Sequence, residues 1–328
     1  MTITLILFLA SAVVIYFACE YFVNGVEWVG QRANVSQNAT GTILAAFGTA
    51  LPESVVTFTA VVFGATPAER DIGVGAAVGG PLVLSTIAYA VVGLTLFGTT
   101  RLASDRSRMV DTDGRRLARD QGWFLLIFLA AFAFGLIGFP GKSWLALFFV
   151  AAYGVYAVRE LRQEADTDIE LEPLKLRPRD KRPSLFWAAS QTLIALAVIF
   201  AASRIFVAQL GRIGPWLGLT PQLTSLLLSP VATEMPETMN AVIWVRQRKE
   251  RLALANISGA MMIQATIPAA LGIGFTPWRF DRPLVVASAI TILAVIALRR
   301  LFRREVSGLR LAPVGLLYLL FAGALLLI

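Results

Sequence analysis

The sequence AFGTALPES (residues 46–54) lies inside a long apolar segment and places the carboxylate of Glu53 directly after a proline. The sequence VATEMPET (residues 231–238) repeats this arrangement 184 positions later, with Thr233 and Glu237 at the positions of Thr49 and Glu53. Proline removes a backbone donor and glycine permits unusual dihedral angles, so each stretch predicts a break in a helix. In the first stretch we expect the break between Gly48 and Pro52.

The surrounding composition is that of a membrane protein. Of 328 residues, 57% are hydrophobic and only 15% are charged, and the mean hydropathy is +0.70. Soluble domains carry about 25% charged residues. Apolar runs of about 20 residues match the hydrocarbon thickness of a bilayer. We therefore predict an all-α membrane protein. The lone Cys19 excludes a disulfide framework within the chain, and the absence of histidine excludes histidine-based metal binding.

Apolar runs between charged or Pro/Gly-rich breaks predict ten transmembrane helices. They span residues 3–24, 40–64, 72–97, 122–139, 143–159, 185–208, 220–245, 252–275, 283–299 and 309–328.

The distribution of basic residues predicts the orientation of these spans. Of the 29 Lys and Arg residues, 23 fall on the face that receives the connections after spans one, three, five, seven and nine. Basic residues collect in cytoplasmic loops. The sequence therefore predicts a cell membrane protein with both termini outside the cytoplasm. The same rule explains the net charge of +8 without a nucleic-acid partner.

The repetition of the motif predicts two related halves. Residues 1–159 form a first repeat of five helices, residues 160–184 a solvated cytoplasmic linker, and residues 185–328 a second repeat. Because five is odd, the second half starts on the opposite side of the membrane. The repeats are therefore predicted to have inverted topology with broken helices 2 and 7, an architecture of secondary transporters that places the substrate site near the midplane.

The motif residues are the candidate cation ligands. A carboxylate at the bilayer centre costs roughly 2.5–3.5 kcal/mol, and no Lys or Arg lies within the two motif stretches to neutralise it. Carboxylate, hydroxyl and carbonyl oxygens suit Na⁺ and Ca²⁺. The predicted ligands are Glu53, Glu237, Glu234, Thr49 and Thr233. The alternative is that Glu53 and Glu237 are protonated structural residues.

GTALPE (residues 48–53) and ATEMPE (residues 232–237) resemble the paired alpha-repeat motifs of the sodium/calcium exchanger family, roughly G-T-S-L-P-E in each half. The resemblance covers an alpha-1 region at 40–97, an alpha-2 region at 220–275 and nearly the whole chain. It implies alternating access, with Ca²⁺ exchanged against Na⁺ as transported ions and no cofactor. Glu53 and Glu237 are then the central carboxylate ligands.

The chain also departs from the family pattern. Ala50 and Glu234 stand where the family often has serine, and the following G-N-x-x-G-S-N motif becomes GAAVGGP (75–81) in the first half. The second copy, ANISGAM (255–261), keeps Asn256 and Ser258. These departures leave the ion and stoichiometry open. Further candidate ligands, which could equally bridge helices, are Asn256, Gln264, Ser229 and Asn240.

Several functions compete with Na⁺/Ca²⁺ exchange. Cation/proton exchange is the first, with Glu234 or Glu53 cycling its protonation. A cation channel usually needs a ring of subunits, whereas here one chain is predicted to hold the complete transport unit, with only ions and membrane lipid as partners. The chain lacks a Walker motif and a nucleophile–base constellation, so neither ATP-driven transport nor an enzyme is expected.

Overall fold

The structure, a computed structural model, describes residues 2–63, 67–102, 113–137, 141–162, 171–216, 218, 227, 229–304, 306–325 and 327. Within these ranges every regular element is a helix, which confirms the all-α prediction for the described part of the chain.

The first half contains α1 (Thr2–Arg32), α2 (Gln37–Ala39), the π-helix η1 (Thr40–Ala45), α3 (Ala46–Phe63), α4 (Pro67–Val83), the π-helix η2 (Leu84–Ala88), α5 (Tyr89–Leu102), α6 (Gly114–Leu136), the short 3₁₀ helix η3 (Lys142–Leu145) and α7 (Ala146–Leu161). The second half contains α8 (Leu185–Trp216), α10 (Ser229–Thr233), α11 (Met235–Arg246), α12 (Glu250–Phe275), α13 (Arg282–Phe302), α14 (Gly308–Leu311), the 3₁₀ helix η5 (Ala312–Gly315) and α15 (Leu316–Leu325).

Eight helices among the described residues are long and apolar enough to cross a membrane. They are Thr2–Arg32, Gly73–Gly98, Gly114–Leu136, Lys142–Leu161, Leu185–Phe206, Glu250–Phe275, Arg282–Phe302 and Gly308–Leu325. The two remaining predicted spans, 40–64 and 220–245, are those that carry the repeated motif. Residues Thr40–Phe63 are continuously helical, as η1 followed directly by α3, and the described residues 229–245 of the second segment form α10 and most of α11.

The predicted break between Gly48 and Pro52 is wrong, because α3 runs through both residues. Span two is irregular earlier, where η1 inserts a π-helical turn at Thr40–Ala45. A proline inside a helix removes one hydrogen bond, and the helix can bend without ending. Pro81 in α4 and Pro268 in α12 are tolerated within helices in the same way. Span seven is interrupted as expected, with a turn at Glu234 between α10 and α11.

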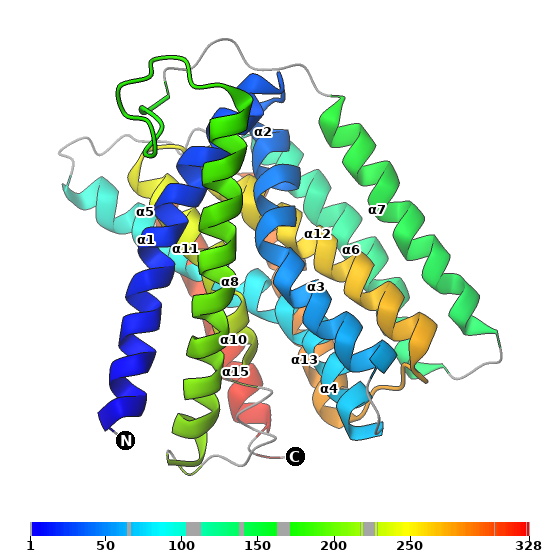
Figure 1. Cartoon of the computed structure of the whole chain (residues 1–328). Coiled ribbons are helices and arrows are strands. Elements are labelled where there is room, and N and C mark those ends of the chain that lie inside the picture. Colours follow the sequence, from blue (N-terminus) through cyan, green and yellow to red (C-terminus); the bar gives the residue numbers. More distant parts are fainter. Residues whose placement is uncertain are drawn as a thin grey trace.

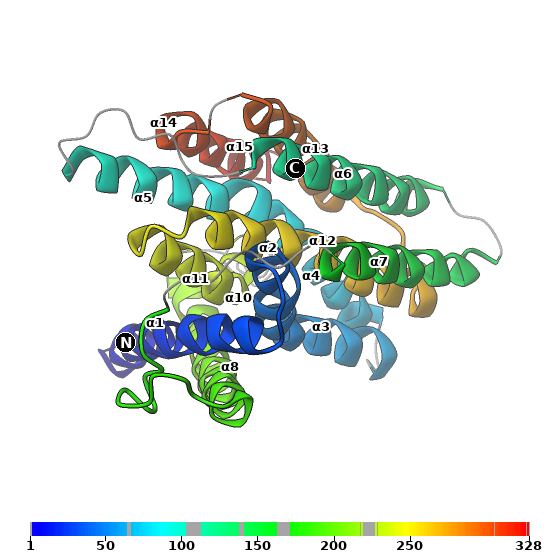
Figure 2. The same cartoon turned by 90° about the horizontal axis from the view of Figure 1, so that it is seen from above.

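The long helices form a bundle with α12 at its centre (Figures 1 and 2). α12 is buried along most of its length and contacts α3, α4, α6, α7, α11 and η1. α1 and α8 lie side by side on one flank of the bundle. α1 begins and α15 ends at the same end of the molecule (Figure 1), as an even number of spans requires.

Close backbone contact fixes α12 against η1. A Cβ atom added at Gly259 would fall 2.5 Å from Cα of Thr42, and one added at Gly41 would fall 2.8 Å from Cβ of Ala255. Small residues at helix interfaces in membranes allow such approach. The irregular start of span two is therefore held directly on the central helix.

The described part of the connection between the two halves, residues 171–184, makes specific contacts with α1. Trp28 Nε1 donates to the carbonyl of Glu172 at 2.9 Å, and the backbone N–H of Lys175 donates to Asn24 Oδ1 at 3.0 Å. Leu174 is fully buried. Residues 171–176 of the predicted linker are therefore not fully solvated, because Leu174 is buried and the backbone N–H of Lys175 pairs with α1.

α6 begins eight residues before the predicted start at residue 122. Asp113 caps it, because its Oδ1 accepts a hydrogen bond from the backbone N–H of Arg116 at 3.1 Å. The additional turns bring Arg116 and Asp120 inside the bundle.

Candidate cation site

Two carboxylates lie where span seven is interrupted. Glu234 occupies the turn between α10 and α11, and Glu237 lies in the first turn of α11. Both side chains have no exposed surface. The N-terminal end of a helix carries partial positive charge, which favours an anion in its first turn. The turn at Glu234 therefore both interrupts the span and places Glu237 where the helix dipole stabilises it.

Buried amide side chains come from α11 and α12. Asn240, on α11, and Asn256 and Gln264, on α12, are almost completely buried. Gln264 Nε2 donates to Oε1 of Glu234, and Asn256 Nδ2 donates to the backbone carbonyl of Glu237 at 3.2 Å. The structure thus brings together Glu234 and Gln264 directly, and ties Asn256 to the backbone of α11.

Gly80 of α4 makes room for the Glu234–Gln264 pair. A Cβ atom at this position would lie 2.8 Å from Glu234 Oε1 and would also meet Oε1 of Gln264. When the two halves are aligned at an offset of 184 residues, Gly80 corresponds to Gln264 and Ala50 corresponds to Glu234. The pair from the second half therefore occupies space that the first half leaves empty.

The two motif threonines take equivalent roles. Thr49 Oγ1 donates to the carbonyl of Ala45 at 3.1 Å, and Thr233 Oγ1 donates to that of Pro230 at 3.2 Å. Each hydroxyl thereby bonds a backbone carbonyl three or four residues earlier in the chain. A hydroxyl oxygen that donates its proton in this way keeps lone pairs that can accept or coordinate.

Glu53 lies in α3, but its side chain falls outside the described part of the structure, as does that of Ser229. α3 packs against α11 and α12, the two helices that carry the buried acid and amides. The convergence of Glu53 with Glu237 stays a prediction.

The possible ligand atoms of this site are the carboxylate and amide oxygens of the buried acids and amides. Among the described side chains no group of three or more Asp, Glu, Cys or His is placed to hold a metal ion. Asn240 Oδ1 and Asn256 Oδ1 have no hydrogen-bond partner among the described residues. Carboxylate and amide oxygens are ligands that Na⁺ and Ca²⁺ prefer, so these residues have the chemistry of a site for such a cation.

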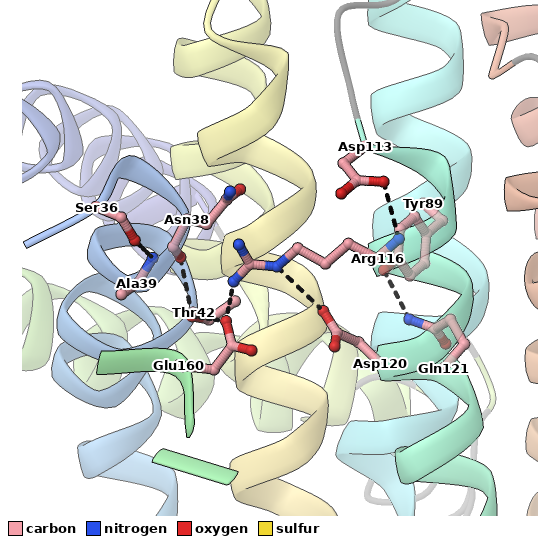
Figure 3. A network of polar contacts seen from close by, with 10 residues as sticks. All are labelled: Ser36, Asn38, Ala39, Thr42, Tyr89, Asp113, Arg116, Asp120, Gln121 and Glu160. Atoms are coloured by element: carbon pink, nitrogen blue, oxygen red, sulfur yellow. Dashed lines mark hydrogen bonds and ion pairs between the residues drawn. The ribbon is translucent and has the colours of Figure 1, made fainter. Parts of the chain in front are cut away.

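A second buried polar network, which the sequence analysis missed, lies between α6, α7 and η1 (Figure 3). Arg116 donates to Oε2 of Glu160, and its Nε lies 3.9 Å from Asp120 Oδ2. The Thr42 hydroxyl donates a shared hydrogen bond to the backbone carbonyl of Asn38 at 2.9 Å and to the same Glu160 oxygen at 3.3 Å. The sequence places Arg116, Asp120 and Glu160 in the connections between predicted spans. The i, i+4 spacing of Arg116 and Asp120 was the available signal that α6 extends this far.

Another missed acid, Glu27 of α1, is held by hydrogen bonds from Trp244 Nε1 at 2.7 Å and Lys249 Nζ at 2.5 Å. It ties α1 to the end of α11, close to the basic face. A Lys partner explains its burial without an ion.

Comparison with protein families matches residues 3–161 and 187–328 to the family described as sodium/calcium exchanger protein. The chain belongs to this sodium/calcium exchanger family. Among curated proteins, it is 25% identical to the putative antiporter CaxA of Alkalimonas amylolytica over 98% of this chain and 100% of that protein. It is also 25% identical to the inner membrane protein YrbG of Escherichia coli over 79% of this chain and 75% of that protein.

Solved structures of the sodium-calcium exchanger NCX_Mj share the fold. One, soaked with Na⁺ and Ca²⁺, matches with a TM-score of 0.74 at 18% identity and covers 98% of both chains. Another, soaked with Na⁺ and no Ca²⁺, has a TM-score of 0.75 at 19% identity, covering 99% of this chain and 100% of the other. The resemblance inferred from the two motifs is therefore confirmed, and the chain is a multi-pass antiporter of this family.

Proposed function

We propose that this antiporter exchanges Ca²⁺ against Na⁺ by alternating access, at a site formed by Glu53, Glu234 and Glu237 with oxygen atoms from Thr49, Thr233, Asn240, Asn256 and Gln264. The observation that carries the proposal is the complete burial of Glu234 and Glu237, with Glu234 accepting a hydrogen bond from the neutral amide of Gln264. The helical segments 229–245 and 252–275, which supply these groups, contain no Lys or Arg. Buried carboxylates in such segments favour a cation as their partner. Ser229 is a further candidate ligand next to the motif.

The proposed mechanism requires the ten-span, inverted-repeat architecture. The segments at 40–64 and 220–245 would add two spans to the eight long helices and give ten. The irregular backbone at η1 and at Glu234 supports the assignment of these two segments as the broken spans. Non-helical backbone at membrane depth is tolerated where it is buried in protein or lines a cavity. One chain then forms the transport unit in the cell membrane, with both termini outside the cytoplasm.

Exchange of a cation against protons is the second candidate, and one specific observation favours it. The Glu234–Gln264 pair has no polar counterpart in the first half, where Ala50 and Gly80 occupy the equivalent positions. A single additional carboxylate, hydrogen-bonded to a neutral amide, is suited to alternate between a bound proton and a bound cation.

Uptake of radioactive Ca²⁺ into proteoliposomes tests both functions, with Na⁺, K⁺ and H⁺ gradients imposed separately. We expect uptake driven by an outward Na⁺ gradient. Uptake driven by a proton gradient without Na⁺ would assign the second function, and Glu234→Gln should then abolish that coupling. Absence of Ca²⁺ uptake under every gradient would contradict both.

A further inference from the structure

A basic pocket opens on the outer surface between α6 and α13, two helices that lie side by side (Figure 2). Its volume is about 420 Å³. The residues that line it are Arg115, Ala118, Arg119, Gly122, Trp123, Leu126, Arg299 and Arg303. We call this the four-arginine pocket. It is separate from the acids of α11 and from the Arg116 network, whose side chains are turned into the bundle.

Helical spacing gathers the four arginines in one place. Arg115 and Arg119 lie one turn apart on α6, and Arg299 and Arg303 lie one turn apart at the end of α13. Gly122 has no side chain between them. As a result, the Arg299 guanidinium lies 3.4–3.6 Å from the position that a Cβ atom at Gly122 would take. A larger residue at 122 would fill the space beside this guanidinium.

No acidic side chain among the described residues forms an ion pair with these four arginines. Arg299 Nε is buried and has no hydrogen-bond partner among the described residues. Arg116, on another face of the same helix, shows the contrast, because it pairs with Glu160 and Asp120. Four like charges repel one another unless an anion lies between them. The pocket therefore has the electrostatics of an anion site.

The apolar residues of the pocket identify the kind of anion. Trp123 and Leu126 follow the arginines along α6, away from the basic face, and their side chains are 40% and 61% exposed. Both lie on a helix that is long and apolar enough to span the membrane. A free phosphate would leave this apolar wall without a partner, whereas an acyl chain would cover it. Basic pockets between membrane helices on the cytoplasmic side are suited to anionic headgroups.

We propose that the four-arginine pocket binds an anionic phospholipid of the leaflet at the basic face, with its phosphate between the arginines of α6 and α13 and its acyl chain along Trp123 and Leu126. The lipid would bridge the two helices. This lipid binding does not depend on which ion is transported, so it is tested independently of the proposed exchange function.

The test uses the full chain, purified and delipidated in detergent, and follows thermal unfolding during titration with phosphatidylglycerol, phosphatidylcholine or inorganic phosphate. The variant R119Q/R303Q removes two exposed pocket arginines. R300Q/R304Q is the matched control, because it removes the same charge from exposed positions on or next to α13 that do not line the pocket.

We expect phosphatidylglycerol to raise the unfolding midpoint of the wild type and of R300Q/R304Q. In R119Q/R303Q the shift should fall to that seen with phosphatidylcholine. Equal phosphatidylglycerol shifts in all three proteins would overturn the proposal, as would a shift reproduced by inorganic phosphate alone, which would indicate a site for a free anion.

A second variant keeps the proposal testable if R119Q/R303Q does not fold. Gly122→Leu fills the pocket without removing charge, and native mass spectrometry counts the phosphatidylglycerol that remains bound. We expect one fewer retained lipid than in the wild type. An unchanged count would contradict the assignment of the lipid to this pocket.

Discussion

Two buried polar clusters of this antiporter differ in how their carboxylates are neutralised. In the network between α6 and α7, the chain itself supplies the cation, because Arg116 lies between Glu160 and Asp120 (Figure 3). In the cluster on α11 and α12, the buried Glu234 accepts a hydrogen bond from the neutral amide of Gln264, and the segments that carry Glu234 and Glu237 contain no Lys or Arg. The first cluster resembles a permanent anchor, whereas the second has the composition of a site that receives its positive charge from outside.

Only the cluster on α11 and α12 suits transport. An exchanger must bind and release its cation, so a covalently attached guanidinium is of no use at the site. A fixed ion pair is useful where the irregular turn η1 must be held, and Thr42 of η1 donates to Glu160. The following variants test this division, from the largest expected effect to the smallest.

Glu237→Gln should abolish Ca²⁺ transport in proteoliposomes while the protein still folds. The substitution keeps the shape of the side chain and removes the negative charge that we assign to cation binding. Glu53→Gln is expected to behave in the same way. If both variants, reconstituted in equal amounts, take up Ca²⁺ at the wild-type rate, Glu237 and Glu53 are not the residues that bind the cation.

Glu160→Gln should destabilise the protein by about 3–5 kcal/mol, because it leaves the buried Arg116 with weaker compensation. The measurement is thermal unfolding in detergent, with Glu20→Gln as control. Glu20 pairs with Lys175 at 3.2 Å, but both side chains are about 30% exposed, and such pairs contribute only about 0–1 kcal/mol. If the two variants unfold at the same temperature, the Arg116 network is not an anchor.

Gly80→Ala should lower the transport rate, because the added methyl group meets Oε1 of both Gln264 and Glu234. Gly75→Ala is the matched control on the same helix, since no heavy atom lies within 4 Å of its Cβ position. Both substitutions carry the same helix propensity gain. Equal rates for the two variants would show that the space at Gly80 has no role in transport.

Thr42→Val should cost about 1 kcal/mol of stability, the typical contribution of one hydrogen bond. It removes the hydroxyl that reaches Glu160 across helices. Thr291→Val is the control, because the buried Thr291 hydroxyl donates within its own helix to Ala287. A loss no greater than that of the control would mean that the contact between η1 and α7 contributes little.

The central acids could be predicted from the sequence because charge in an apolar segment is rare. Glu234 and Glu237 stood out in the TEMPE motif, and Asn240, Asn256 and Gln264 were recognisable as amides in predicted spans. Their burial follows from the same fact, since polar side chains within a membrane bundle face its interior.

The network of Arg116, Asp120 and Glu160 could not be predicted in the same way. Hydropathy assigns charged residues near a span end to the connections. The i, i+4 spacing of Arg116 and Asp120 favours a longer α6, but it does not indicate the contact with Glu160, which depends on α6 beginning at Gly114 and α7 continuing to Leu161. The position of the irregular turn was also missed. Proline is compatible with a continuing helix in α3, whereas the π-helical turn at Thr40–Ala45 has no equally plain sequence signal.

The most direct test of the external cation is equilibrium binding of radioactive Ca²⁺ to the purified protein in detergent, measured for the wild type, Glu237→Gln and Glu160→Gln. We predict saturable binding that Na⁺ displaces in the wild type, the same binding per folded molecule in Glu160→Gln, and none in Glu237→Gln. Undiminished binding by Glu237→Gln would contradict the account, because the acid of α11 would then not be needed to hold the ion.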